Sequence, residues 1–514
     1  MSVHAMPALS RRNFLVGTST LGVAAGFRRD GLIGRALAQT NAADKCPSDY
    51  WQSLADRLVG PLLCNGDSRF HRFAEPFNLA YNKDASQPTA IALCANRQDV
   101  MTAVNWARDH DVTPVVRSGG HSYGGYSMGR GLMIDVSLLK RFSWNGPRNE
   151  LTVECGARNG DVYNVLRSEN RTTTHGRCPT VGIAGFLLGG GIGFNMRRYG
   201  VGSDHMVSGE IVTADGKTLK LSEDENADLF WASRGGGGGN FGINTAFTIE
   251  TVPASRVTVF SVKWRAPRKT AEAIALALMG ALDERDGRLG SRFKFYKDRS
   301  APDGSRAVVE VLGQLYGPPQ EVAALLKEMP SPSQGVVVEA DVAELDYWDG
   351  QDFLVDWEGP FRFFERSMFL TQNLDATAIG TAFEHLWELE LSSDKDFTPD
   401  ARFFQTGGRI NEIDAQATAF VHRDSRWLMD FGLPWSAQED DAWVTRNRAR
   451  QDRLFDAMAA YGNGRSYQNF VDPALGNFKT AYYGQNLSRL IDVKRRYDPN
   501  NLFKFAQSIP LSKS

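Results

Sequence analysis

Two nucleophilic side chains, each inside a glycine-rich loop, are the residues of this sequence with the clearest chemical potential. His121 lies in Arg117-Ser-Gly-Gly-His-Ser-Tyr-Gly-Gly125, and Cys178 lies in Gly176-Arg-Cys-Pro-Thr-Val-Gly182. Glycine permits positive φ and close approach of the backbone to a ligand, and successive free N–H groups bind anions such as a pyrophosphate. Imidazole and thiol groups can both add to an electrophilic ring. The pair therefore indicates a flat cofactor that is attached at two points.

These loops resemble those of the berberine-bridge-enzyme-like flavoproteins, a branch of the vanillyl-alcohol-oxidase superfamily with a PCMH-type FAD-binding domain. Residues 178–185, 188–193, 237–243 and 482–503 are similar to family segments in the family order, so the resemblance runs from about residue 60 to the C-terminus. It implies FAD bonded through its 8α-methyl group to His121 and through C6 to Cys178. It also implies cofactor contacts from Arg117, Ser118, Gly119, Gly120, Ser122, Val181, Gly182, Gly185, Gly189, Gly190, Gly191, Gly193, Asn240, Gly242, Tyr467 and Asn469.

One position departs from the family pattern. The family often has Gly-His in the second loop, where this sequence has Ala184-Gly-Phe186. The missing imidazole affects the tuning of the flavin redox potential and leaves both points of attachment in place.

The resemblance also suggests catalytic residues. Tyr467, in Tyr467-Gln-Asn-Phe470, is similar to a family tyrosine that faces flavin N5, and we expect it to remove the hydroxyl proton of the substrate. Its ordinary pKa of about 10 requires a neighbour or a positive field for ionisation near neutrality. Asp430 is the nearest candidate for a helping carboxylate, and Tyr123 is a further candidate of the site. Arg402 could steady the tyrosinate or bind an acidic substrate instead.

These residues predict an oxidoreductase that transfers hydride from an alcohol or sugar hemiacetal to FAD and is reoxidised by O2, giving hydrogen peroxide. In the family, the residue three positions after the flavin-bound cysteine controls the approach of oxygen, and the small Val181 stands there. Aromatic side chains that stack on sugars favour a carbohydrate substrate, although the same residues also suit core packing: Tyr123, Trp357, Phe361, Phe363, Phe364 and Phe404.

Three alternatives remain open at this stage. A dehydrogenase of the same fold would pass electrons to an acceptor other than oxygen. A serine hydrolase would use Ser122 or Ser127, because both stand in G-x-S-x-G after a strand-like segment. Such an elbow leads straight into a helix, whereas a second strand-like segment, 132–136, follows here. A non-catalytic flavin-binding or sugar-binding protein would keep the loops and lack a base.

The N-terminus carries an export signal. A twin-arginine pattern at 10–15 precedes a weakly apolar stretch at 14–27 and the Ala-x-Ala motif Ala36-Leu-Ala38. The stretch is too short and too rich in Gly, Ser and Thr to span a bilayer. We expect removal of residues 1–38 and a periplasmic or secreted product.

Composition fits a large globular enzyme. The 514 residues are 42% hydrophobic and 23% charged, and the formal net charge is −2. Residues 1–38 contain five arginines and one aspartate, so the mature chain is near −6, which argues against nucleic acid or an anionic membrane as a partner. Cys46, Cys64 and Cys94 could supply one disulfide, and Cys155 is expected to be a buried thiol. Metal-binding motifs are absent, so we expect no metal site.

The order of elements predicts an α+β fold. A strand at 88–95 and a helix at 97–110 begin an alternating pattern that continues to about residue 251. Longer strands then alternate with amphipathic helices near 269–285, 318–329, 375–389 and 437–461, which suits an antiparallel sheet backed by helices. Its strands are expected at 257–264, 307–315, 336–342, 401–410 and 426–431. We expect a two-subdomain PCMH-type FAD domain at 45–255, an α/β substrate domain at 256–460, and a segment at 461–514 that returns to the FAD domain.

Overall fold

The computed structural model describes residues 46, 48–301, 303–330, 336–356 and 359–512. All of them belong to one compact unit, Thr40–Ser514. The predicted export signal at 1–38 and Trp357 lie outside the described residues.

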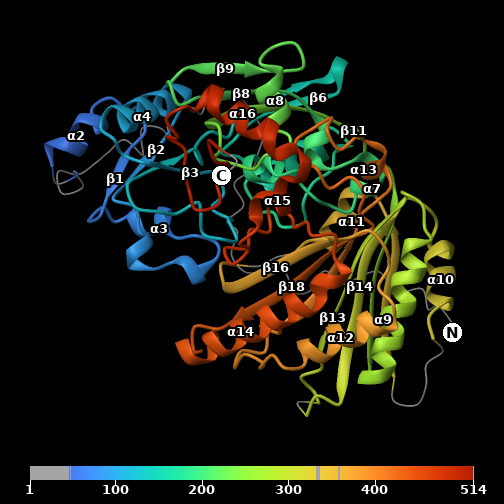
Figure 1. The fold of residues 1–514 in the computed structure, drawn as a ribbon. Coiled ribbons are helices and arrows are strands. Elements are labelled where there is room, and N and C mark those ends of the chain that lie inside the picture. The colour runs from blue at the N-terminus through green and yellow to red at the C-terminus, as the bar shows by residue number, and fades with distance from the viewer. Residues whose placement is uncertain (1–45, 47, 302, 331–335, 357–358, 513–514) are drawn as a thin grey trace, which may run out of the picture. The chain divides into compact units, whose positions relative to one another are not determined.

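A small mixed sheet begins the fold, in the order β1 (Leu62–Cys64), β2 (Ala90–Leu93), β4 (Leu132–Asp135), β3 (Pro114–Arg117). Strands β2 and β3 run parallel to β4 (Figure 1). Helix α4 (Arg97–Asp109) begins where the Asn96 side chain accepts a hydrogen bond from the Asp99 N–H at 2.9 Å, and it buries Val100 and Val104. The strand and the helix expected here from the sequence are both present.

A disulfide joins Cys46 to Cys64 at the end of β1. Cys94 and Cys155 are buried free thiols. The structure thus selects one of the pairings that the sequence left open, and it agrees with the expectation for Cys155.

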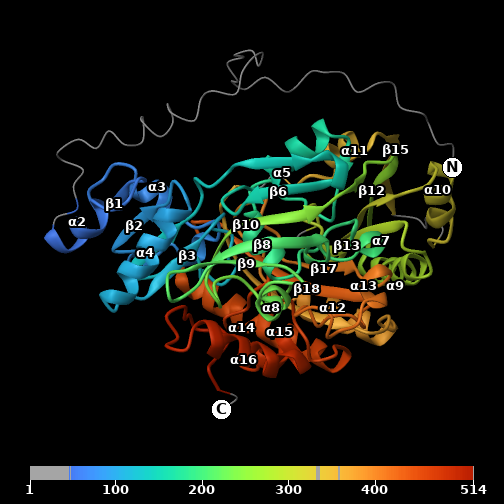
Figure 2. The ribbon, with the colours of Figure 1, turned by 90° about the horizontal axis from the view of Figure 1, so that it is seen from above.

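A second, antiparallel sheet follows in the order β5 (Phe142–Asn145), β6 (Glu150–Glu154), β10 (Ile243–Glu250), β8 (Met206–Val212), β9 (Thr218–Leu221). Figure 2 shows β10, β8 and β9 side by side. Between its strands lie α5 (Asn159–Ser168), α6 (Ile183–Leu188), α7 (Met196–Tyr199) and α8 (Ala227–Ala232), and the short β7 (Arg171–Thr172) pairs with β11 (Val252–Pro253). The two glycine loops lie between β3 and β4 and between β7 and α6.

The seven-stranded sheet is antiparallel throughout. Its order is β15 (Val337–Leu345), β12 (Val257–Pro267), β14 (Arg306–Leu315), β13 (Leu289–Lys297), β17 (Asp400–Gln405), β18 (Trp427–Trp435), β16 (Arg362–Leu370). Helices α9 (Arg268–Asp283), α12 (Ala376–Leu386) and α14 (Asp441–Met458) lie along one face (Figure 1). Alternate side chains such as Phe293, Phe403 and Met429 form the core beneath them.

The sequence missed two of these strands and extended a third too far. Strands β13 and β16 were not expected, and the strand predicted at 401–410 ends at Gln405. Gly407 and Gly408 take φ values of 84° and 57°, and the short helix α13 (Arg409–Glu412) follows them. Positive φ at both positions breaks the extended conformation.

The C-terminal segment packs against earlier elements of the chain. Helix α16 (Leu487–Tyr497) packs beside α8 (Figure 1), and α15 (Phe478–Tyr483) packs against α16. The buried Lys494 ammonium donates to the carbonyl oxygens of Asn240 and Phe503 and to Asp498, all within 2.7 Å. The α+β class predicted from the sequence is confirmed.

Candidate functional site

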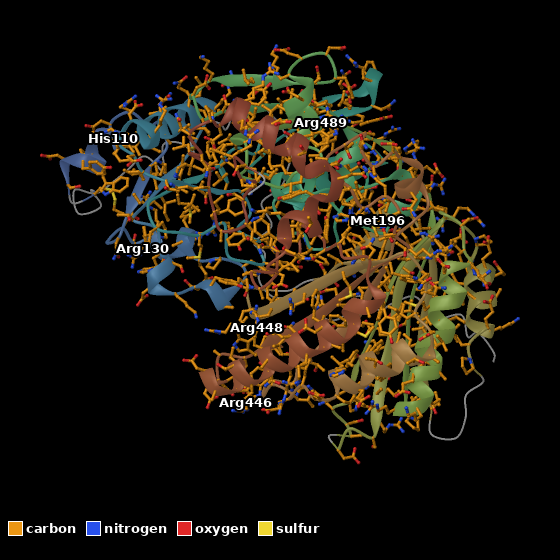
Figure 3. All side chains as sticks on the ribbon, in the orientation of Figure 1. His110, Arg130, Met196, Arg446, Arg448 and Arg489 are labelled. Carbon is orange, nitrogen blue, oxygen red and sulfur yellow. A yellow bond between two sulfur atoms is a disulfide. The ribbon has the colours of Figure 1, made fainter. Side chains whose placement is uncertain are left out.

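A cavity of about 680 Å³ opens between the glycine loops and the polar face of the seven-stranded sheet. One wall comes from the loops at 118–123 and 176–182 and from 237–240. The other comes from β13, β16 and β17, through Arg292, Phe363, Glu365, Arg402 and Phe404. Arg130 and Met196, which lie well apart in Figure 3, both line the cavity, so it is elongated.

The loop that contains His121 has the form of a phosphate cradle. Within the described chain, the N–H groups of residues 119–122 have no acceptor. Gly120 has a φ of 73°, and a Cβ atom there would lie 2.8 Å from the Arg117 guanidinium. On the same wall, Cβ atoms on Gly238 and Gly239 would meet nothing closer than 3.7 Å. Free N–H groups and bare backbone suit a diphosphate.

Several buried polar atoms at the cavity also lack partners among the described residues. They are Ser127 Oγ, Asn159 Oδ1 and Asn244 Nδ2. Buried polar atoms are normally hydrogen-bonded, so these three point to a polar ligand. The donor and acceptor set therefore fits FAD.

Thr180 joins the two nucleophiles. Its hydroxyl lies 2.8 Å from His121 Nε2 and 3.2 Å from Cys178 Sγ. The His121 ring also stacks on Phe77, with centroids 3.7 Å apart. Burial, helped by the positive charges of Arg158 and Arg117, lowers the pKa of His121 to about 3. The imidazole is thus neutral at physiological pH and keeps a lone pair for bond formation. Sequence reasoning missed Thr180 and Phe77 as parts of this arrangement.

The Tyr467 phenol lies in the same cavity. Its oxygen accepts hydrogen bonds from the Gly191 N–H at 3.0 Å and from Asn469 Nδ2 at 3.2 Å. Burial raises the pKa of Tyr467 to about 12, and the two donors oppose that rise because they stabilise the phenolate. The sequence analysis required a neighbour that helps Tyr467 to ionise. That neighbour is a pair of N–H groups, one from Gly191 in a glycine loop and one from Asn469 in the same motif as Tyr467.

A charged cluster replaces the single carboxylate that the sequence suggested. Arg402 donates to Glu365 Oε1 at 2.7 Å and to Asp400 Oδ1 at 2.8 Å, and it lies 3.4 Å from Asp430 Oδ2. Asp430 is fully buried and does not line the cavity, whereas Glu365 does. Arg402 contacts these carboxylates and not Tyr467. The sequence analysis missed Glu365 because it did not predict strand β16, on which this residue lies.

The two inner carboxyl groups of the cluster, Glu365 and Asp430, have raised pKa values. Glu365 Oε2 and both Asp430 oxygens accept no hydrogen bond from an N–H group or a hydroxyl of the described chain. Burial raises the pKa of Glu365 well above its ordinary value, Arg402 opposes the rise, and Asp430 adds to it. Burial likewise raises the pKa of Asp430. Burial therefore favours the protonated form of both carboxyl groups.

Most of the predicted cofactor residues line the cavity, and a few support it from behind. The lining residues are Ser118, Gly119, Gly120, His121, Ser122, Cys178, Val181, Gly182, Gly185, Gly193, Asn240, Gly242, Tyr467 and Asn469. The Arg117 side chain points away from the cavity, and its Nε lies 3.5 Å from Asp135 Oδ2. The backbone of Gly189, Gly190 and Gly191 packs under Asn469, Phe420 and Phe186 in turn, too close for any side chain.

Phe186 stands at the position where the resemblance suggested an imidazole. Its ring lines the cavity and is 7% exposed. Cβ atoms on Gly191 or Gly202 would come within 2.7 Å of it, and one on Gly176 within 3.3 Å. Three glycines therefore make room for the ring, so the surrounding backbone accommodates a phenylalanine at position 186.

The aromatic residues that the sequence analysis offered for stacking on a sugar divide into two groups. Tyr123 lines the cavity and stacks on Phe470 at 5.2 Å, and burial raises its pKa well above the ordinary value, so its hydroxyl stays neutral. Phe361, Phe363 and Phe404 also line the cavity. Phe364 does not, and packs against Trp435 and Arg448 instead.

The hydrolase alternative finds no support in the geometry. Residues 118–131 form turns, no helix is found in that described stretch, and β4 follows. Ser122 Oγ accepts from the Tyr126 N–H at 3.0 Å, and Ser127 Oγ contacts no base among the described residues. Neither serine has the elbow geometry of a nucleophile.

Comparisons with known proteins point the same way. Residues 88–222 match the family "FAD binding domain", and residues 466–510 match "Berberine and berberine like". An uncharacterised FAD-linked oxidoreductase of Bacillus subtilis, YgaK, is 31% identical over 467 residues, which cover 88% of this chain and 97% of the relative. A carbohydrate oxidase of Microdochium nivale is 28% identical over 481 residues, covering 87% and 92%.

The fold agrees with a solved relative. The structure of Physcomitrella patens BBE-like 1 superposes with a TM-score of 0.80 at 26% identity, and the match covers 91% of this chain and all of that one. In the part of the chain that is described, no helix has the length and apolarity needed to cross a membrane.

The buried cluster gives a stability prediction. Arg402→Met removes the cation that opposes the raised pKa values of Glu365 and Asp430. Breaking a buried pair on one side should lower the free energy of unfolding by about 3–5 kcal/mol. The folded variant must then hold protons that the unfolded chain releases above about pH 4.5, so stability should fall as the pH rises from 5 to 8.

Thermal denaturation at pH 5 and pH 8 measures this difference. Arg409→Met is the matched control, because Arg409 is exposed and pairs with the exposed Glu412 at 3.0 Å. It should change the free energy of unfolding by less than about 0.5 kcal/mol. An equal loss at both pH values in Arg402→Met would show that the cluster does not hold the extra proton.

Proposed function

Since this chain belongs to the berberine-bridge-enzyme-like FAD-linked oxidoreductases, we propose that it oxidises an alcohol or sugar hemiacetal with FAD bonded to both His121 and Cys178. One observation carries the proposal. The two nucleophiles meet at Thr180, in the same cavity as the Tyr467 phenol. A double attachment site and a candidate base thus face one space, as hydride removal from an alcohol requires.

FAD, held by the loops at 118–123 and 176–182, would supply the acceptor for a hydride from the carbinol carbon of the substrate. The protein must remove the hydroxyl proton at the same time, and Tyr467 is positioned to receive it. Donation from the Gly191 N–H and from Asn469 Nδ2 lowers the energy of the phenolate. On the sheet side, burial raises the pKa of Glu365, which lines the cavity, and that of Asp430 behind it.

Carbohydrate is the favoured substrate class. Flat aromatic rings line the wall formed by the sheet, among them Phe361, Phe363 and Phe404, and such rings stack on sugars. A relative that is similar over 87% of this chain is named carbohydrate oxidase. We propose neither a nucleic acid nor a membrane as a partner.

Export is also part of the proposal. It rests on the twin-arginine pattern and Ala36-Leu-Ala38, which lie outside the described residues. A mature chain that begins after Ala38 would support a periplasmic or secreted location, and one that begins at Met1 or Ser2 would exclude it.

Double attachment predicts a distinct pattern in variants. His121→Ala and Cys178→Ala should each retain flavin through the other residue, and the double variant should release all flavin on acid precipitation. Flavin fluorescence of the denatured protein band gives the measurement. Cys155→Ala is the control, because that thiol is buried away from the cavity. Release of FAD by acid from the unmodified protein would exclude a covalent bond.

Proton removal by Tyr467 predicts both a rate and a pH dependence. Tyr467→Phe should slow anaerobic flavin reduction by a sugar about 100-fold or more. Because the pKa of Tyr467 is raised to about 12 and the phenolate is the active form, the wild-type rate should rise with pH throughout the range from 6 to 10.

Tyr296→Phe is the matched control, since its hydroxyl lies on β13 outside the cavity. If Tyr467→Phe keeps the wild-type rate and Glu365→Gln abolishes it, the base is Glu365 instead.

Reoxidation by O2 depends on space beside Val181, which lines the cavity. Val181→Leu adds a methylene to a packed wall, and such a change is worth about 10-fold or more where it fills the reacting volume. We expect slower reoxidation by O2 in stopped-flow experiments, with little change in the rate of flavin reduction. Slow wild-type reoxidation by O2, beside fast reoxidation by a quinone, would make the enzyme a dehydrogenase, with Phe186 as a candidate barrier.

A further inference from the structure

Three arginines line the wall that the seven-stranded sheet and its neighbours contribute to the cavity: Arg177, Arg292 and Arg402. Two of them are matched with carboxylates that also line it. Arg177 donates to Asp356 at 3.2 Å, and Arg402 donates to Glu365 at 2.7 Å. The lining carboxylates are therefore already engaged.

Arg292 differs from the other two. Its guanidinium makes no hydrogen bond within the described chain, although the residue is only 8% exposed. Among the described residues, the nearest carboxylate oxygen is Asp356 Oδ2, at 3.9 Å, and that carboxylate is the partner of Arg177. Arg292 Nε is fully enclosed and has no acceptor among the described residues. The Arg292 guanidinium therefore has a distant ion-pair neighbour, Asp356, and no direct hydrogen bond among the described residues.

A guanidinium cannot relieve this situation by losing its proton. A buried charge without a hydrogen-bond partner is destabilising, so such a group is normally satisfied by a ligand or a second charge. The surroundings add positive charge, because Lys294 follows two residues later on the same face of β13. Glu365 and Asp430 offset less of it than two fully ionised carboxylates would, since burial raises the pKa of both groups.

The position of Arg292 separates it from the phosphate cradle. It lies on β13, directly opposite Phe404 of β17 in the sheet register, and Phe404 is one of the aromatic residues assigned to the substrate. The free N–H groups suited to a diphosphate belong to the loop at 119–122. Arg292 is thus part of the substrate side of the cavity.

We propose that Arg292 binds an anionic group of the substrate, a carboxylate, so that the substrate is a carboxylate-bearing alcohol or sugar such as a uronic acid. The planar guanidinium offers two parallel N–H donors that match the two oxygens of a carboxylate. This inference rests on the proposed function above for the reacting end of the substrate. The binding of the anion is a property of Arg292 alone.

Binding can be tested without turnover by using glycosides whose anomeric hydroxyl is blocked. The holoenzyme is titrated with methyl β-D-glucuronoside and with methyl β-D-glucoside, and Kd is read from the change in flavin absorbance. The two probes differ in one group, a carboxylate against a hydroxymethyl. We expect the glucuronoside to bind about 10-fold or more tightly, since a hydrogen bond to a charged group contributes that much.

Variants assign this preference to Arg292. Arg292→Gln should remove it with little change in the Kd of the neutral glucoside, and Arg292→Lys should retain part of it. Arg265→Gln is the matched control, because Arg265 lies on β12 of the same sheet, outside the cavity, and pairs with Glu339 at 3.4 Å. The amount of covalent flavin and the flavin spectrum report whether each variant has kept its fold.

The outcomes separate this inference from the proposed function. Equal Kd values for the two probes, a preference that survives in Arg292→Gln, or no measurable binding of the glucuronoside would overturn the role of Arg292. A flavin spectrum that changes in Arg292→Gln before any ligand is added would assign the residue to the cofactor and overturn it as well. Anaerobic reduction by free D-glucuronate and D-glucose tests alcohol oxidation separately. If the anion preference is found and neither sugar reduces the flavin, the proposed reaction fails and the anion site stands.

Discussion

The backbone contact between the two glycine loops is the constraint on which the rest of the site depends. A Cβ atom on Gly119 would lie 2.3 Å from the Gly182 nitrogen, and one on Gly182 would lie 2.4 Å from the Gly119 nitrogen. Any side chain at either position would force the loops apart. Because the loops touch, Thr180 can reach both His121 and Cys178, and neither the small mixed sheet nor the α6 loop could place these nucleophiles alone.

The second wall of the site follows from the two-residue period of the seven-stranded sheet. One face is apolar and is covered by α9, α12 and α14. The other carries Arg402, Lys294 and Asp430 at neighbouring positions, which would repel or destabilise one another if they were unpaired. The central arginine holds three carboxyl groups, so a strongly charged face can be buried against a cofactor cavity.

Burial gives the cavity a common electrostatic character. It lowers the pKa of His121 and raises those of Tyr467 and Glu365, so all three tend toward their neutral forms. Neutral imidazole suits bond formation, and a phenol with two N–H donors suits proton removal that is coupled to hydride loss. Within this environment the Arg292 guanidinium stands out, because it has no hydrogen-bond partner among the described residues.

The sequence by itself determined the chemistry-bearing loops, the class of fold and most of the long helices, because glycine spacing, nucleophile type and apolar periodicity are local properties. It suggested His121, Cys178 and Tyr467 as site residues, and it limited the disulfide to three cysteines. Only the tertiary structure decided that Cys64 pairs with Cys46 while Cys94 stays buried. The structure also shows that the carboxylate lining the cavity is Glu365 and not Asp430, and it draws attention to Arg292. Strand periodicity fixes which side chains share a face, but the packing of segments more than 100 residues apart decides which face meets the loops.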